Sequence, residues 1–262
     1  MESPLEKSDI LSAIKNGELM PLLDIILNLP IAHVNRTEFL AKTFNLSESD
    51  IINNLVDIPF EQREKAAKKQ INSTVLQTSA IAFASGIPGG IAMVGTVPGD
   101  ILQNMVYSVR LAQQLAFIYD IDIEKDDKID AQSMVLFLGT MFGVNGAASL
   151  LRVTSTNTGK YLSQKVLSAG LSKTIWYPVF KKIVRIVSGK TLTIKALSKS
   201  TTKILPIIGG ITSGGLTFVA MKKAANLLNI ELQKGHVQKY SVSDYEKDIV
   251  ILEGEFQKST EH

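Results

Sequence analysis

Asp100 and Arg110 are the only charged residues between positions 71 and 119. Two such charges in an apolar stretch fit either of two interpretations. Asp100 can be a helix N-cap and Arg110 a surface arginine, or the two can form a buried polar pair that lines a cleft. A carboxylate and a guanidinium interact strongly where water is excluded. Both residues are therefore candidates for a functional site.

The residues most often used in catalysis or metal binding are scarce. The chain has no cysteine, which excludes thiolate nucleophiles, disulfides and Cys-based metal sites. Its three histidines, His33, His236 and His262, are isolated from one another and from any motif. A His-based triad or metal site is therefore not expected, and no cofactor is predicted.

Three segments resemble known binding loops but lack a defining feature of each. Residues 86–90 are glycine-rich, but the G-x-G-x-x-G spacing of a dinucleotide site is missing. Gly189-Lys190-Thr191 ends like a P-loop without the upstream glycine. The acidic run 120–130 lacks the glycine at position six and the closing glutamate of a calcium loop. We interpret this run as a solvated acidic linker.

An aromatic pair precedes a short basic helix that is expected to begin near Pro178. Apolar residues of this helix fall on one face and cations on the other, a pattern typical of proteins that lie on anionic lipid. An ordinary surface helix with its apolar face in the core has the same pattern. The candidate surface residues are Trp176, Tyr177, Lys181, Lys182, Arg185 and Lys190.

The charge distribution is strongly asymmetric although the net charge is only +3. Residues 131–230 contain thirteen lysines and arginines and no aspartate or glutamate. The other 162 residues carry 15 basic and 25 acidic side chains, a net charge of −10. This segregation predicts an anionic partner, which could be lipid headgroups, nucleic acid or the acidic remainder of the chain folding back.

The elements that must position these residues are predicted to be helices throughout. We expect an all-α, compact multi-helix bundle with glycine-rich apolar helices in its centre. Ser47 and Asp100 are expected N-caps, and the first 28 residues should form short amphipathic helices. The acidic residues after 234 are expected to be loosely attached. The other expected helices span residues 36–44, 47–56, 100–119, 161–173 and 179–187.

Three uncharged runs are long enough to raise the question of membrane insertion. They cover residues 71–99, 131–151 and 204–221, and a spanning helix needs about 20 apolar residues. All three are interrupted by glycine, and two also by proline. Gly139–Gly143 and Gly210–Gly214 have the spacing that brings helices close together. Buried helices in a core, an inserted hairpin and true spanning helices all remain open.

Five segments, in their order and spacing, resemble the EcsC family of bacterial proteins over roughly residues 20–230. The resemblance implies a link to an ABC transporter locus and leaves the biochemical role undefined. A reductase label that some relatives carry finds no support in these residues. At position 99 a glycine replaces the alanine or other small residue more usual in relatives. The segments are residues 34–40, 86–90 with 95–100, 141–147, 171–178, and 204–210 with 213–217.

Together these observations predict an N-terminal extension at 1–19, an EcsC-like helical domain at 20–233 and an acidic tail at 234–262. The N-terminus lacks a basic region followed by an apolar core, so no signal peptide is expected. We expect a cytoplasmic, non-enzymatic accessory protein at the inner face of the membrane, bound to anionic lipid and to a membrane-protein partner. The alternative is a pore-type effector that inserts glycine-rich hairpins. Nucleic acid is a less favoured partner because no motif supports it.

Overall fold

The structure, a computed structural model, describes residues 18–77, 99–125, 128–155, 173–192, 214–236 and 239–260. These ranges form ten helices and one short hairpin, which confirms the predicted all-α fold. The helix expected at 161–173 lies almost entirely outside them. The helices are α2 (Leu19–Leu27), α3 (Arg36–Phe44), α4 (Glu48–Ile52), α5 (Phe60–Gln77), α7 (Gly99–Ile118), α8 (Ala131–Met141), α9 (Ala147–Thr154), α11 (Lys173–Leu192), α12 (Gly214–Gly235) and α13 (Val242–Thr260).

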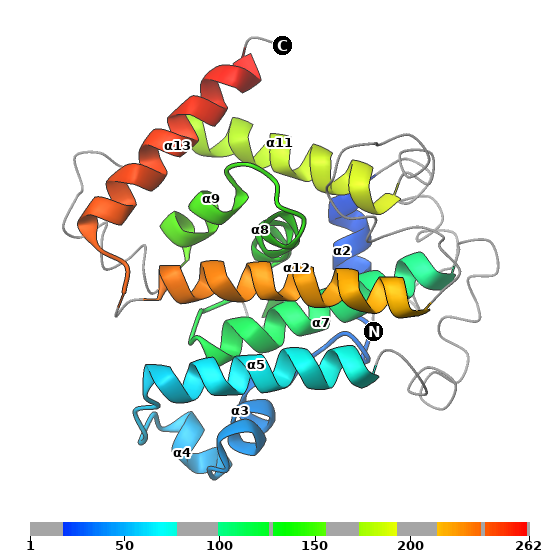
Figure 1. The fold of residues 1–262 in the computed structure, drawn as a ribbon, viewed down its shortest axis with the longest axis vertical. Helices are drawn as coiled ribbons and strands as arrows, with labels where there is room; N and C mark the ends of the chain where they lie inside the picture. The colour runs from blue at the N-terminus through cyan, green and yellow to red at the C-terminus, as the bar shows by residue number, and fades with distance from the viewer. Residues whose placement is uncertain are drawn as a thin grey trace.

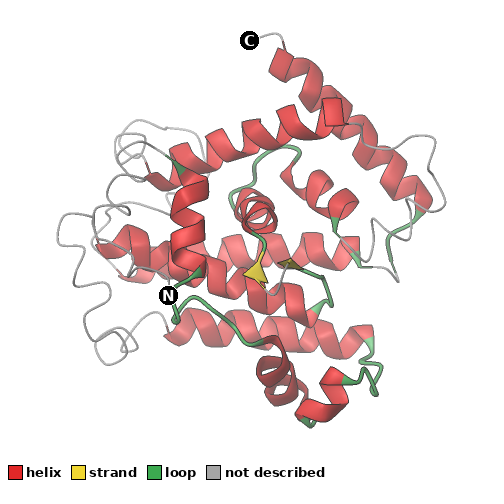
Figure 2. Cartoon of the chain, turned by 180° about the vertical axis from the view of Figure 1, so that it is seen from behind, coloured by secondary structure: helices red, strands yellow, loops and turns green. Residues whose placement is uncertain are grey.

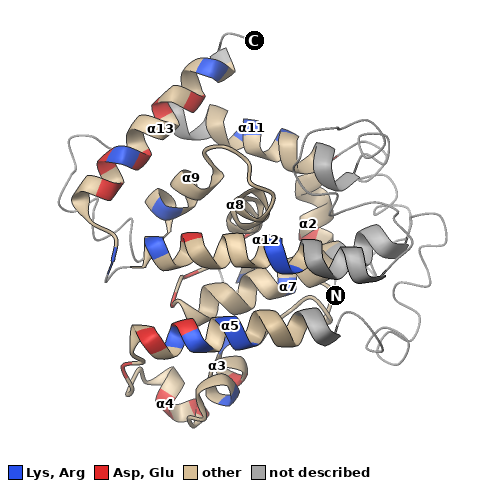
Figure 3. Cartoon of the chain, viewed as in Figure 1, with Lys and Arg blue, Asp and Glu red and all other residues tan. Residues whose placement is uncertain are grey.

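Helix α8 is the centre of the bundle and is seen end-on in Figure 1. It packs against α9, α11 and α12 and also contacts α2 and α7. Every residue from Met134 to Met141 is buried, and Figure 3 shows no charged residue on this helix. A helix that is apolar on all sides has to be enclosed by others. The first part of the second uncharged run, Ala131–Met141, therefore forms the central helix of the core.

This run is not one continuous helix, because it turns between α8 and α9. Gly143 and Gly146 both have a positive φ, of 63° and 81°, a conformation that glycine adopts without strain. Gly143 thus lies in the turn, and the prediction that it pairs with Gly139 on one helix face is wrong. Of these two glycines, only Gly139 lies in tight contact with neighbouring helices, against Ile183 of α11 and Ala147 of α9.

Side-chain caps set the beginnings of the N-terminal helices. Asn35 accepts a hydrogen bond from the Glu38 amide and starts α3 at the residue predicted. Ser47 and Asp50 form the expected capping box of α4, which ends at Ile52, earlier than predicted. Helix α7 begins at Gly99, so Asp100 lies in its first turn and not at the N-cap position.

The acidic linker contains a small antiparallel hairpin that faces the viewer in Figure 2. Its strands are β1 (Glu124–Lys125) and β2 (Lys128–Ile129), and Glu124 pairs with Ile129. Asp130 ends the linker and caps α8 through the amides of Gln132 and Ser133. The linker is therefore partly ordered by backbone pairing.

Helix α11 is longer than predicted. It runs for 20 residues from Lys173, so Pro178 lies inside it and not in its first turn. Pro178 has no N–H to donate to the carbonyl of residue 174. Burial of Val179, Phe180 and Ile183 against the core offsets this loss.

Within the described residues, no helix is long and apolar enough to cross a membrane. Most of the uncharged run 71–99 and residues 204–213 of the third run lie outside these ranges, and so does Gly210.

Candidate functional site

The outer face of α11 carries the described part of the predicted basic surface. Lys181 and Arg185 are exposed and lie one helical turn apart, while Phe180, Ile183 and Val187 face the core. Helix α11 contains no aspartate or glutamate over its 20 residues. Residues 176, 177 and 190 belong to the same helix, but the side chains of Trp176, Tyr177 and Lys190 lie outside the described residues.

Lys182 does not belong to this exposed surface, which corrects the prediction. Its Nζ lies 2.8 Å from Oε2 of Glu255 on α13, and only 19% of its side chain is exposed. Lys258 binds the other carboxylate oxygen of Glu255 at 3.0 Å. Burial is the largest single influence on the pKa of Glu255 and raises it. The hydrogen bonds and charges of Lys182 and Lys258 together outweigh burial, so this pKa is lowered.

A second inward-facing cation, Arg152 of α9, joins three elements. Its Nε and Nη2 donate to the two carboxylate oxygens of Asp248 on α13, at 2.8 and 2.6 Å. Its Nη1 pairs with Glu231 of α12. The Tyr240 hydroxyl also donates to Asp248, at 2.6 Å. Burial and this acceptor raise the pKa of Tyr240. The fork of one guanidinium thus fixes α13 and α12 to α9.

These ion pairs show that the acidic segment after 234 is not a loosely attached tail. Helix α13 packs along α9 and α11 (Figure 1), and Tyr245, Asp248, Leu252 and Glu255 are all buried. The expectation of loose attachment is therefore wrong. The alternative, that acidic residues fold back on the basic stretch, holds for Arg152 and Lys182.

An aromatic and polar cluster closes the bundle where α5, α7 and the end of α12 meet. The buried Tyr119 hydroxyl donates to Asn229 at 2.8 Å and accepts from Gln233 at 3.0 Å. Burial is the main cause that raises the pKa of Tyr119 to about 12. The His236 ring lies 4.9 Å from the Phe60 ring and 6.4 Å from that of Tyr119, measured between centroids.

Acidification should destabilise the fold through His236. Burial first, and then the charge of Arg63, lower the pKa of His236 below its ordinary value of 6.5. The unfolded chain therefore takes up the proton more readily. The stability contributed by the neutral ring is complete above pH 6.5 and is lost as the pH falls through the lowered pKa. Between pH 7 and 5, urea unfolding should show a smaller decrease in the free energy of unfolding for His236→Phe than for the wild type. An equal loss in both proteins would contradict this assignment.

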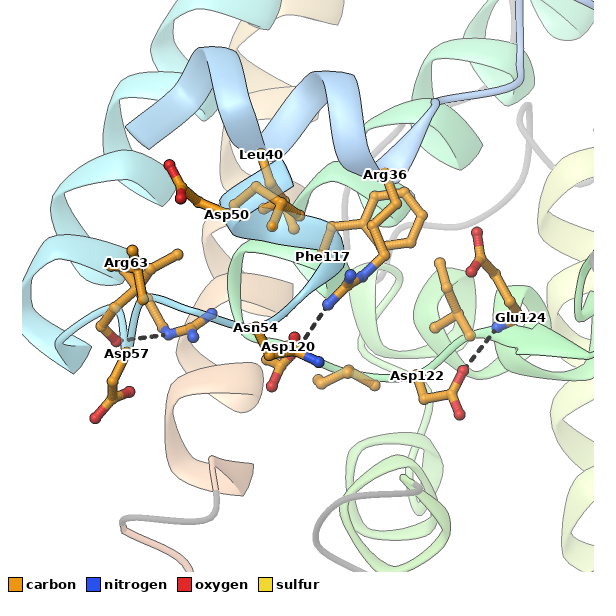
Figure 4. Close-up of a pocket in the computed structure, with 15 residues that line it drawn as sticks. Arg36, Leu40, Asp50, Asn54, Asp57, Arg63, Phe117, Asp120, Asp122 and Glu124 are labelled. Carbon is orange, nitrogen blue, oxygen red and sulfur yellow. Dashed lines mark hydrogen bonds and ion pairs between the residues drawn. The ribbon is translucent and has the colours of Figure 1, made fainter. Parts of the chain in front are cut away.

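Two clefts of opposite charge lie on either side of α3. The acidic cleft (Figure 4) has a volume of about 560 Å³ and is lined by five carboxylates and two arginines. Arg36 pairs with Asp120 at 2.8 Å. Arg63 donates to the carbonyls of Ile58 and of Ile118, the last residue of α7, at 3.0 and 2.6 Å. The carboxylates are those of Asp50, Asp57, Asp120, Asp122 and Glu124.

No metal centre emerges from these acids. In the described part of the chain, no three His, Asp or Glu side chains converge well enough to hold a metal ion. Asp50 is engaged with Ser47 in the α4 cap, and Asp122 accepts from the Glu124 amide at 3.2 Å. The acidic cleft is therefore best described as a surface of negative charge.

The basic cleft is bounded by α3, α5 and α7 and has a volume of about 650 Å³. Arg110, one of the two predicted polar residues, lines it. Its Nη1 donates to the carbonyls of Ile31 and His33, at 3.0 and 2.8 Å. Burial is the largest influence on the pKa of Arg110 and lowers it, and the nearby Tyr107 hydroxyl only partly opposes this effect. Arg110 thus lies in a cleft, as one interpretation of the sequence required.

Asp100 and Arg110 are ten residues apart on α7. At a rise of 1.5 Å per residue, their Cα atoms are separated by about 15 Å along the helix axis. The side chain of Asp100 lies outside the described residues. The backbone of α7 therefore does not itself bring the two into contact, and their pairing stays a prediction.

Comparison with known proteins gives no relative to set beside this geometry. No family model, no curated protein and no solved structure matches the chain.

Proposed function

We propose that this protein is a non-enzymatic accessory protein of the EcsC type that binds the anionic inner face of the cell membrane as a peripheral protein. The observation that carries the proposal is the outer face of α11, where Lys181 and Arg185 are exposed on a helix without acidic residues. Cations at an anionic surface each contribute about 1 kcal/mol. A link to a transporter or a lipid process belongs to the same proposal, through a membrane-protein partner.

The inward ion pairs sharpen this proposal because they separate two kinds of cation in the basic stretch. Arg152 and Lys182 face carboxylates of α12 and α13. Lys181, Arg185 and Lys223 are exposed. The acidic part of the chain thus neutralises Arg152 and Lys182, which hold the bundle together, while the exposed cations lie at the surface where headgroups would meet them. Trp176 and Tyr177, at the beginning of the same helix, would add interfacial anchors.

Flotation with vesicles tests this proposal. Full-length protein should float with phosphatidylcholine–phosphatidylglycerol vesicles and not with pure phosphatidylcholine. Lys181→Gln combined with Arg185→Gln should weaken binding by roughly thirtyfold, the effect of two cations at about 1 kcal/mol each. Added salt should reduce binding because exposed charges are screened.

The matched control removes two exposed lysines from another helix, Lys65→Gln with Lys68→Gln on α5. This variant has the same net charge as the α11 variant and should keep its binding. The proposal would be refuted if the wild-type protein floated equally with neutral and anionic vesicles, or with neither. Resistance to carbonate extraction would instead favour the inserting effector.

A further inference from the structure

The geometry points to a second binding site, the basic cleft between α3, α5 and α7, which would take a small ligand bearing a phosphate group. It goes beyond the peripheral membrane role and does not depend on it. The cations that line it are Lys42 from α3, Lys69 from α5 and Arg110 from α7, with Glu38 as the one lining carboxylate. A cleft of about 650 Å³ lies within the usual range for small-molecule sites.

One wall of the cleft is held in place by side chains of α7. Arg110 donates to the carbonyls of Ile31 and His33. Gln113 accepts from the Val34 amide at 3.1 Å and donates to the Ala32 carbonyl at 2.9 Å. Four hydrogen bonds thus fix the connection between α2 and α3 against α7. A ligand that enters this cleft would meet a preorganised wall, which lowers the entropic cost of binding.

Arg110 is a half-buried cation without a counter-charge in the described structure. Among the described residues, no carboxylate lies within 4.0 Å of Arg110, Lys42 or Lys69. Arg36, Arg152 and Lys182, by contrast, each pair with a carboxylate. Desolvating a cation without such compensation costs free energy. A bound anion would recover that cost.

The guanidinium of Arg110 also has donors left over. Its two hydrogen bonds to described residues both come from Nη1, and no described residue accepts from Nε or Nη2. Every fully buried side-chain nitrogen or oxygen in the described part of the chain has a partner. The remaining donors of Arg110 are therefore accessible to solvent in the cleft that it lines. Two adjacent N–H groups of one guanidinium match two oxygens of a phosphate.

The rest of the lining favours a phosphate on a small polar molecule over a free ion alone. Asn35, Thr43, Gln70 and Gln114 contribute amide and hydroxyl groups around the cations, and Phe39 adds an apolar surface. Such groups would bind the hydroxyls of a polyol-like ligand. The carboxylates of the acidic cleft lie on the other side of α3, so an anion would be drawn to the basic side.

This site is separate from the α11 surface. In Figure 1, α11 and α3 lie at opposite ends of the long axis, with α8, α12 and α7 between them. A flat membrane in contact with α11 would not reach the cleft. The phosphate could therefore belong to a soluble ligand or to the headgroup of a lipid presented at that end, and the two sources can be told apart.

Calorimetric titration of the full chain with inorganic phosphate and with glycerol 3-phosphate tests the inference. Both should bind, and the double variant Lys42→Gln/Lys69→Gln should weaken binding by about tenfold because two charge-assisted contacts are lost. Both lysines are exposed and form no ion pair with a described residue, so their replacement should leave folding intact. Lys65→Gln/Lys68→Gln removes the same charge from α5 outside the cleft, and should bind like the wild type.

Vesicles of phosphatidic acid in phosphatidylcholine provide the second arm, in the background of Lys181→Gln/Arg185→Gln. A lipid headgroup would be identified as the source if the protein binds these vesicles but not the soluble phosphates. The Lys42→Gln/Lys69→Gln replacement should then weaken binding to the vesicles. Absence of binding in both arms would overturn the inference. So would equal affinities of the cleft variant and its control for every probe. Neither result would bear on the α11 surface, whose test uses phosphatidylglycerol and other residues.

Discussion

Arg152→Met is expected to lower the free energy of unfolding by about 3–5 kcal/mol. The substitution removes the cation and leaves the buried carboxylates of Asp248 and Glu231 facing each other, with side chains that are only 4% and 13% exposed. Lys234 still pairs with Glu231 at 2.8 Å, but it is mostly exposed and does not reach Asp248 in the structure. Since typical domains are stable by about 5–15 kcal/mol, this loss should be plain in urea unfolding.

Arg185→Met is the matched control, because Arg185 is exposed on α11, and its effect should stay within about 0.5 kcal/mol. A loss below about 1 kcal/mol for Arg152→Met would show that this network does not hold α13 in place.

Gly139→Val is expected to cost about 3 kcal/mol through overpacking at the centre of the bundle. A Cβ on Gly139 would lie 2.8 Å from Cγ2 of Ile183 and 3.0 Å from Cβ of Ala147. Neither neighbour can yield easily, because one is a β-branched side chain and the other has only its Cβ. Helix α8 would have to move away from α11 and α9. Thermal and urea unfolding of the variant measure the effect.

Gly254→Ala provides the opposite control. Gly254 lies inside α13, and a Cβ there would meet nothing within 4 Å. Alanine should stabilise this helix by about 1 kcal/mol through its higher helix propensity. Gly139→Ala gains the same propensity but meets the same close contacts, so it should be destabilised. If both alanine variants were stabilised alike, the close packing of α8 would be refuted.

The helices that the sequence predicted well are those with local signals. Asn35 and Ser47 mark their own helix starts, and the uniform apolarity of residues 134–141 indicated burial. Pro178 misled the prediction for α11, because tertiary burial of the helix face outweighs the local cost of a proline. Such a balance between local and tertiary energies is not visible in a short window of sequence.

The ion pairs that join α13 to α9 and α11 were not predicted, although the sequence contains a signal for them. Tyr245, Asp248, Leu252 and Glu255 recur at intervals of three, four and three residues, the spacing of one helix face. Two acids on an apolar stripe indicate buried partners of opposite charge. The polar and acidic composition of the segment after residue 234 made this stripe hard to recognise. The partners themselves, Arg152 and Lys182, are 96 and 73 residues away from their acids, and no local pattern specifies such pairings.

The basic cleft itself was not predicted, although one of its residues was named as half of a polar pair with Asp100. Arg110 was a candidate because it is isolated among apolar residues, and it does line a cleft. Lys42 and Lys69 had no such signal, since they stand in charged helices whose sequences read as ordinary solvated faces. Only the packing of α3 and α5 against α7 places them beside Arg110.

The order of charges along the chain has a consequence for synthesis on the ribosome. Arg152 and Lys182 are translated before Glu231, Asp248 and Glu255, the acids that neutralise them. While residues 231–255 are still inside the exit tunnel, the nascent chain has a surplus of cations and no partner for them in the bundle. Docking of α13 is therefore a late step, which follows the emergence of the helices that it joins. Until it happens, Arg152 and Lys182 are without these acids, in a chain that emerges beside the anionic ribosomal RNA.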